Sequence, residues 1–342
     1  MRQASLWERI RNASLFWALV ALALVMLFNL FFTPNFFQLE IKDGHLFGSL
    51  IDILNRGAPL MLMAIGMTLV IATAGVDLSV GAVAAISAAV ATTLIGNVTG
   101  ATDTPLWLVI AISLGVALLC GLWNGLLVSR ARIQPMVATL VLMVAGRGIA
   151  QLITDGQIIT IYYQPFYYFG AGYLLGLPFT LFIVAAVFIF ALVMTRRTAI
   201  GLFIESVGVN TSSSFYSGIN EKNIKLLAYV FCGLTAGIAG IIISSNVKSA
   251  DANHVGEYSE LDAILAVVIG GTLMSGGRFS LAGSVVGALL IQSVTTTIYA
   301  FGVPPEVVLV VKALVVLFVV LLYSQPVKVA LDKLSRQRGV QA

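Results

Sequence analysis

Apolar runs separated by short polar segments repeat along almost the whole chain. Each run is about 20 residues long, which lets a helix cross the ~30 Å hydrocarbon core of a bilayer. Barrel strands would instead be ~10-residue segments of alternating polarity, and lipid admits no other spanning structure. The pattern therefore predicts an all-α, polytopic membrane protein with about ten spans, at residues 13–33, 57–74, 80–96, 106–128, 135–153, 178–195, 223–245, 260–274, 281–301 and 306–323.

The composition also favours a membrane protein over a soluble one. Hydrophobic residues make up 59% of the 342 residues and charged residues 10%, whereas a soluble domain carries about 25% charged residues. No segment between the predicted spans is long enough to bury a soluble core, so residues 1–342 are expected to form a single transmembrane domain. The first run exceeds the roughly 7–15-residue apolar region of a signal peptide, so we expect it to remain as a span.

The Lys and Arg residues are distributed asymmetrically across the predicted spans. One set of loops holds only Lys42, Arg56 and Lys248. Because cytoplasmic loops carry the excess of positive charge, both termini and residues 196–222 are predicted to be cytoplasmic. The net charge of +4 is attributed to anionic lipid headgroups and insertion rather than to nucleic acid. The cytoplasmic set contains 14 of the 19 basic residues, namely Arg2, Arg9, Arg11, Arg130, Arg132, Arg196, Arg197, Lys222, Lys225, Arg278, Lys328, Lys333, Arg336 and Arg338.

Small residues recur within the spans at a spacing typical of close helix packing. Such pairs let helices approach each other in lipid, so they predict a compact bundle. Cys120 and Cys232 both lie within predicted spans and are interpreted as apolar packing residues, not as a disulfide. The small-residue pairs are Gly121 and Gly125, Gly233 and Gly237, and Gly283 and Gly287.

The sequence carries no motif for energy conversion. A P-loop needs a Gly-rich turn that ends in Gly-Lys-Ser/Thr, and the chain has no Gly-Lys pair. His45 and His254 are single and distant in sequence, so no metal site is expected. The chain is therefore predicted to be neither an enzyme nor a cofactor-binding protein. Any ATP and Mg²⁺ would be bound by a separate ATPase subunit.

A few polar side chains interrupt the predicted spans. Arg147 lies inside the fifth span, where a charge is costly and faces a cavity or a partner; a functional role and a structural ion pair both remain open. The uncharged polar residues either line a path for a hydroxyl-rich solute or bond one helix to another. The candidate translocation path consists of Asn124, Thr139, Arg147, Gln151 and Gln292.

Asp77 lies at the start of the third span, directly before Leu78 and Ser79. Its carboxylate is expected to cap the exposed N–H groups there and to meet the positive end of the helix. A direct role in transport is the alternative.

Residues 199–220 form a polar cytoplasmic segment between the sixth and seventh spans. The segment is too polar to cross the membrane and too long for a tight turn. One or two short helices broken at Gly208 fit it, as an ordinary loop or as a docking element for a partner.

Several segments resemble one known family, at residues 66–81, 134–140, 260–264, 270–272 and 276–277. They are similar to the inner-membrane permeases of bacterial ABC sugar importers, the group that includes ribose, xylose and galactofuranose permeases. Within that group the resemblance is closest to the galactofuranose permeases. The closer match lies in residues 51–59, 145–154 and 250–253.

This resemblance implies that residues 199–220 contain the coupling helix, which docks on the ATPase in such permeases. The usual pattern, Gly-x-Asn-x-x-Ala-Ala-x-x-x-Gly-Ile, is matched at its Gly, Asn and final Gly-Ile positions, whereas Ser213 and Ser214 replace the alanine pair. The residues expected to couple the chain to the ATPase are Glu205, Gly208, Asn210, Ser213, Ser214, Phe215 and Gly218.

The resemblance further implies a permease subunit of the bacterial inner membrane that imports a monosaccharide, galactofuranose or a related sugar. An ATP-binding-cassette ATPase, a periplasmic sugar-binding protein and a second permease subunit, identical or different, would complete the complex. A branched-chain amino-acid permease is the alternative, although a zwitterion favours charged groups in the path. A secondary transporter fits less well because it would use midplane carboxylates, and Asp77 and Asp262 lie at span ends.

Overall fold

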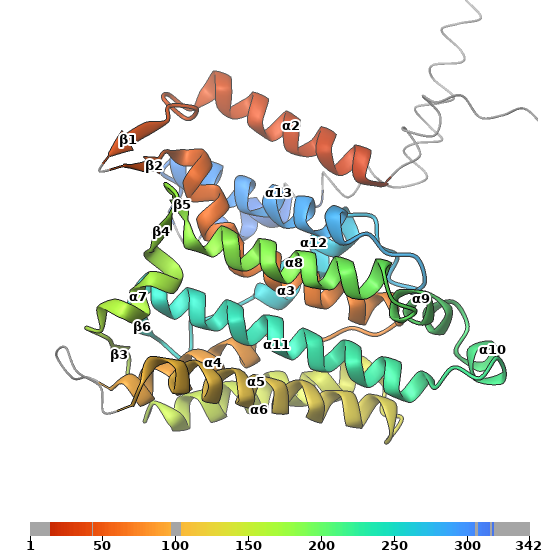
Figure 1. The fold of residues 1–342 in the computed structure, drawn as a ribbon. Coiled ribbons are helices and arrows are strands. Elements are labelled where there is room, and N and C mark those ends of the chain that lie inside the picture. Colours follow the sequence, from red (N-terminus) through yellow and green to blue (C-terminus); the bar gives the residue numbers. More distant parts are fainter. Residues whose placement is uncertain (1–13, 43, 97–103, 305–306, 315–316, 318–342) are drawn as a thin grey trace, which may run out of the picture.

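The computed structural model describes residues 14–42, 44–96, 104–304, 307–314 and 317. The long helices lie side by side in one bundle (Figure 1). Their bounds are α2 (Ser14–Phe32), α3 (Ser49–Ala72), α4 (Val80–Ile95), α5 (Leu106–Ser129), α6 (Pro135–Ile153), α8 (Phe179–Arg196), α11 (Glu221–Val247), α12 (Ser259–Ile269) and α13 (Leu281–Ala300).

Short elements occupy the two ends of the bundle (Figure 1). One end, the strand end, carries α7 (Gln164–Ala171) and three antiparallel strand pairs. The opposite end carries α9 (Ile200–Val209) and α10 (Thr211–Tyr216) and is called the α10 end. The strand pairs are β1 (Glu40–Lys42) with β2 (His45–Phe47), β3 (Ile159–Thr160) with β6 (Ser249–Ala250), and β4 (Tyr173–Leu174) with β5 (Leu177–Pro178).

The all-α polytopic architecture predicted from the sequence is confirmed. Among the described residues, seven helices are long and apolar enough to cross a membrane: α2, α3, α5, α6, α8, α11 and α13. The helix predicted at 57–74 begins earlier, at Ser49. The sequence placed its start too late because polar residues such as Asn55 and Arg56 lie within the first turns of α3. Most of the tenth predicted span, 306–323, lies outside the described residues. Residues 307–314 of this span are described and are helical.

The predicted span 260–274 is wrong as a full crossing. Helix α12 ends at Ile269 after 11 residues, and at ~1.5 Å per residue it covers only about half of the hydrocarbon core. The apolar pattern continues past this point, but Gly270 and Gly271 end the helix, and Gly271 has a positive φ of 88°. Helix α4, an apolar helix of 16 residues, is also shorter than the other spans.

Both short helices begin inside the bundle rather than at its surface. A Cβ on Gly81, in the first turn of α4, would lie 2.3 Å from the carbonyl oxygen of Gly256, just before α12. The same Cβ would lie 3.4 Å from the guanidinium of Arg147, in the second half of α6. Residues 73–79 and 251–258 therefore form two non-helical segments, called here the first and second interruptions, that enter the bundle.

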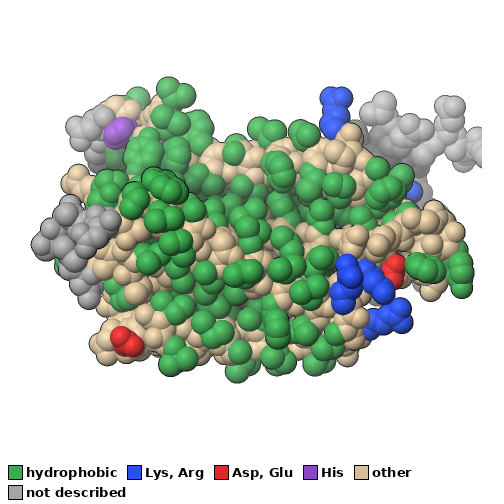
Figure 2. All heavy atoms as spheres, turned by 60° about the horizontal axis from the view of Figure 1, so that its bottom comes forward, with side chains coloured by type: hydrophobic (Ala, Val, Ile, Leu, Met, Phe, Trp, Pro, Cys, Tyr) green, Lys and Arg blue, Asp and Glu red, His purple; other side chains and the backbone are tan. Residues whose placement is uncertain are grey.

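The centre of the bundle is formed by α3 and α11. The apolar windows of these helices are 78% and 67% buried, whereas those of α2, α5, α6 and α8 are only 17–28% buried. The outer helices therefore present apolar side chains to their surroundings, as a lipid-facing surface requires. Hydrophobic side chains cover most of the face in Figure 2, and Lys and Arg side chains gather near the α10 end.

Glycines let neighbouring helices approach at backbone distance, as the small-residue pairs predicted. A Cβ on Gly233 of α11 would lie 2.8 Å from the Cα of Gly121 of α5. Similarly, a Cβ on Gly287 of α13 would lie 2.1 Å from the carbonyl oxygen of Ala266 in α12. Cys120 and Cys232 are both free thiols, as expected, and Cys232 is buried.

A single added methyl group should separate two of these helices. A Cβ on Gly240 of α11 would lie 2.1 Å from the carbonyl oxygen of Ala84 in α4, so Gly240→Ala must displace α4. We expect a loss of about 1–3 kcal/mol, as for overpacked cores, measured as a lower unfolding temperature in detergent. Gly115→Ala in α5 is the matched control because its Cβ would meet nothing within 4 Å. Equal unfolding temperatures for the two variants would contradict this packing.

Candidate functional site

The first interruption is held by a buried polar network around Asp77. Its Oδ1 accepts hydrogen bonds from the N–H of Ser79 at 2.9 Å and from the Ser79 hydroxyl at 2.6 Å. Asn124 of α5 donates to the Ser79 hydroxyl at 2.8 Å and to Asp77 Oδ1 at 3.4 Å. Thr139 of α6 accepts from the N–H of Leu78 at 3.1 Å. The network thereby joins α5, α6 and the start of α4.

Asp77 does not bond the N–H groups inside α4 that it was expected to cap. Ser79 is the N-cap residue of α4 and its side chain makes no capping bond. The carboxylate instead binds Ser79 itself, two residues further along the chain. Asp77 is 1% exposed, so its carboxylate fixes the backbone before α4 from a position buried in the protein.

Arg147 and Gln151 of α6 hold the second interruption. The Arg147 guanidinium donates to the carbonyl oxygens of Ala252 at 3.1 Å and Val255 at 2.5 Å. One turn further along α6, the Gln151 amide donates to Asn253 Oδ1 at 2.5 Å. The ion pair weighed for Arg147 is replaced by backbone carbonyls, because a loop that leaves regular structure inside the bundle exposes such acceptors.

His254 and Asp251 form a second, exposed contact within the same interruption. His254 Nδ1 lies 2.7 Å from Asp251 Oδ2. The exposed residues Gln151, Asn253, His254 and Glu257 therefore give this side of the bundle a polar surface.

The five candidate path residues do not form one site. Asn124 and Thr139 are buried beside Asp77, while Arg147 and Gln151 bind the second interruption. Gln292 lies elsewhere: its amide donates to Thr296 in its own helix, and it packs against the Gly57 position of α3. Sequence alone could not separate these groups, because each is simply a polar residue inside an apolar run.

The polar segment 199–220 folds as two short helices at the α10 end. The break between them lies at Asn210, not at Gly208 as predicted, because α9 continues to Val209. Asn210 caps α10 by accepting a hydrogen bond from the N–H of Ser213 at 2.9 Å. The Ser214 hydroxyl returns a bond to the Asn210 carbonyl at 2.9 Å. Gly218, with φ of 84°, follows α10 and turns the chain toward α11.

Gly208 brings α9 against the end of α3 and the loop that follows α12. A Cβ on Gly208 would lie 1.9 Å from the carbonyl oxygen of Ala72 and 2.4 Å from the N–H nitrogen of Gly277. Ala72 is the last residue of α3 before the first interruption, and it accepts a hydrogen bond from Gly277 at 2.9 Å. A displacement of α9 is therefore felt directly at the end of α3 and in the loop that follows α12.

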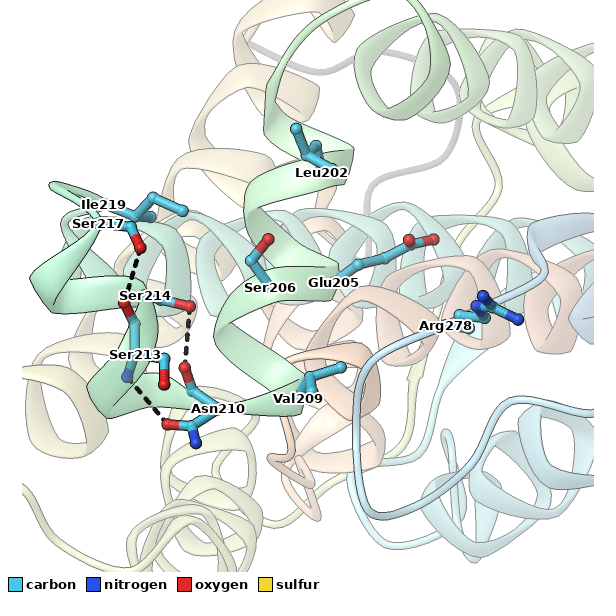
Figure 3. A pocket seen from close by; sticks show the side chains of 10 residues that line it. All are labelled: Leu202, Glu205, Ser206, Val209, Asn210, Ser213, Ser214, Ser217, Ile219 and Arg278. Carbon is cyan, nitrogen blue, oxygen red and sulfur yellow. Dashed lines mark hydrogen bonds between the residues drawn. The ribbon is translucent and has the colours of Figure 1, made fainter.

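A cleft of about 580 Å³ opens between α9, α10 and the loop after α12. Its floor is rich in hydroxyl groups, and Glu205 of α9 and Arg278 of the loop extend into the same space (Figure 3). Phe215 and Tyr216, on α10, are 62% and 87% exposed. The cleft is lined by Leu202, Glu205, Ser206, Val209, Asn210, Ser213, Ser214, Ser217, Ile219 and Arg278.

Arg278 lines this cleft. From the sequence it was identified only as one of the basic residues predicted to be cytoplasmic. Its position depends on Gly276 and Gly277, whose φ angles of 85° and 95° turn the loop toward α9. The Gly-Gly-Arg order was the available signal, but only the folded chain brings it opposite Glu205.

A family model described as the permease component of branched-chain amino acid transport systems matches residues 49–320. The galactofuranose transporter permease protein YtfT of Escherichia coli is 54% identical over 90% of this chain and 89% of its own length. The fructose import permease protein FruF of Bifidobacterium longum is 37% identical, covering 98% of this chain and 94% of that protein. The ribose import permease protein RbsC of E. coli is 36% identical over 89% of this chain and 92% of that protein. No solved structure matches the chain.

Removal of the Asp77 carboxylate separates a structural role from a direct role in transport. Asp77→Ala leaves the buried N–H and hydroxyl of Ser79 without their acceptor, which should cost about 1–3 kcal/mol. We expect a lower unfolding temperature in detergent, whereas the control Asp155→Asn, which removes a carboxylate from an exposed turn and keeps a residue type that tolerates its φ of 51°, should leave it unchanged. An Asp77→Ala variant that unfolds like the wild type but no longer supports uptake would contradict the structural role.

Proposed function

The chain belongs to this family of transport permeases, and we propose that it is the membrane subunit of an ATP-driven importer of galactofuranose or a related monosaccharide. The observation that carries the sugar assignment is the 54% identity to a galactofuranose permease over nine-tenths of the chain. The fructose and ribose permeases support the same substrate class at lower identity.

The polar residues of the bundle also favour a sugar over an amino acid, the alternative that the family description raises. A bound zwitterion calls for charged partners, but Asp77 and Arg147, the two charges that hold the interruptions, already bind groups of the chain itself. Arg147 binds two backbone carbonyls, and Asp77 binds Ser79. The groups that stay exposed on this side include the amides of Gln151 and Asn253, which suit hydroxyl groups.

The exposed face of α6 is the proposed wall of the sugar path. Leu140 and Val144 are 49% and 66% exposed, and Arg147 and Gln151 continue at helical spacing toward the strand end. Polar side chains at membrane depth avoid lipid and face a water-filled space or a protein partner. We therefore assign the covering element to a second permease subunit, with the sugar passing between the two subunits.

The α9–α10 region is the proposed contact with a separate ATPase subunit. It projects at the end where the described Arg and Lys residues gather, which the positive-inside rule makes cytoplasmic. Phe215 and Tyr216 offer exposed aromatic anchors beside the hydroxyl-rich cleft. Through Gly208, α9 would pass a movement of the ATPase to the end of α3 and to the loop after α12. Sugar would be delivered at the strand end by a periplasmic binding protein.

Loss of the Phe215 anchor should uncouple the importer. We expect Phe215→Asp to reduce the stimulation of ATP hydrolysis by the sugar-loaded binding protein at least about tenfold, because exposed aromatics often dominate interface energy. Phe215→Leu, which keeps an apolar side chain, is the matched control and should retain most of the stimulation.

The assay uses the assembled importer in lipid together with its binding protein. Galactofuranose, ribose and leucine are supplied in turn as the solute. Stimulation of wild-type ATP hydrolysis with leucine, but with neither sugar, would overturn the sugar assignment. Wild-type stimulation in Phe215→Asp would instead overturn only the coupling role of α10.

A further inference from the structure

A second cleft lies on the other side of α10, between that helix and the ends of the membrane helices. Its volume is about 480 Å³. Ser129 and Arg132 come from the end of α5 and the turn into α6, and Lys222 and Lys225 from the first turns of α11. The full lining is Ser129, Arg132, Thr211, Ser212, Phe215, Tyr216, Glu221, Lys222 and Lys225.

The charge of this cleft is positive and is not neutralised within the chain. Arg132, Lys222 and Lys225 face a single carboxylate, that of Glu221. Within the described part of the chain, none of the three cations forms an ion pair or a side-chain hydrogen bond. Three basic groups therefore line one cavity without an anionic partner among the described residues, which suits an anionic ligand.

The wall of the cleft also contains an unused hydrogen-bond group. The Ser129 hydroxyl is buried, at 4% exposure for the residue, and has no partner. A buried polar group without a partner is costly and indicates an absent ligand or water. The hydroxyls of Thr211 and Ser212 line the same space, so hydroxyl donors and cations converge there, as oxygen-rich anions require.

We propose that this cleft binds the phosphate of an anionic phospholipid headgroup. The position favours a lipid because α5, α6 and α11 all end or begin here, at the charged end of the apolar bundle (Figures 1 and 2). Basic pockets between membrane helices on the cytoplasmic side bind acidic headgroups in this way. The bound lipid would link α10 to α5 and α11 and hold the coupling segment in register with the bundle.

The test compares lipid retention by the purified full chain, without an ATPase, using native mass spectrometry. The probes are phosphatidylglycerol and phosphatidylcholine with identical acyl chains. The double variant Arg132→Gln/Lys225→Gln removes two cations of the cleft. Arg196→Gln/Arg197→Gln removes two exposed cations at the end of α8, away from the cleft, and is the matched control. Arg132→Lys keeps the charge and reports whether the fold tolerates a change there.

We expect the wild type to retain phosphatidylglycerol in preference to phosphatidylcholine. The cleft variant should lose about fivefold in retention for each cation removed, while the control variant and Arg132→Lys keep the preference. Millimolar inorganic phosphate should not displace the lipid, because it lacks the acyl chains that bind beside the apolar bundle.

Three results would overturn the proposal. Equal retention by the cleft variant and the wild type would place the lipid elsewhere. Full displacement by inorganic phosphate would make the cleft a site for free anions. Unchanged lipid retention in the cleft variant, together with weaker binding of that variant to the ATPase subunit in a separate pull-down, would assign the three cations to an acidic segment of the ATPase.

Discussion

The structure depends on one constraint: backbone groups inside the membrane must find hydrogen-bond partners within the protein. Regular helices meet this requirement on their own, but the two interruptions do not. Thr139 and Asp77 supply acceptors for the N–H groups of Leu78 and Ser79, and Arg147 supplies donors for the carbonyls of Ala252 and Val255. The polar side chains of the spans thus first serve to make non-helical backbone possible at membrane depth.

Interrupted helices connect the two ends of the molecule. Helices α4 and α12 begin next to each other at Gly81 and Gly256, and they run toward opposite ends of the bundle. The α9 helix touches Ala72, the last residue before the first interruption, and Gly277, in the loop that follows α12. A transporter that opens alternately to two sides needs such an element, one that a partner on one side can move without unfolding the spans. Close contacts at glycines pack the other helices against one another.

Much of the fold followed from the sequence, while most site geometry did not. Run length and charge asymmetry predicted the helical class, and Gly121 and Gly233 marked a real helix interface. The length of α12 was overestimated because apolar residues continue past Gly270. Arg147 was recognised as unusual, but its partners are carbonyls over 100 residues away, which no local pattern reveals. In the sequence, Gln292 looked like the other polar residues, since each lies within an apolar run. It differs from them in its position in the bundle, which only the folded chain shows.

We propose that this chain forms the path for the sugar and that a separate ATPase drives transport through α9 and α10. Uphill accumulation of labelled sugar in proteoliposomes tests this most directly, with the permease present throughout and ATP enclosed on the ATPase side. With the sugar-loaded binding protein outside, accumulation above the external concentration should occur only when the ATPase subunit is included. Sustained accumulation by the permease preparation without any ATPase subunit would contradict the account.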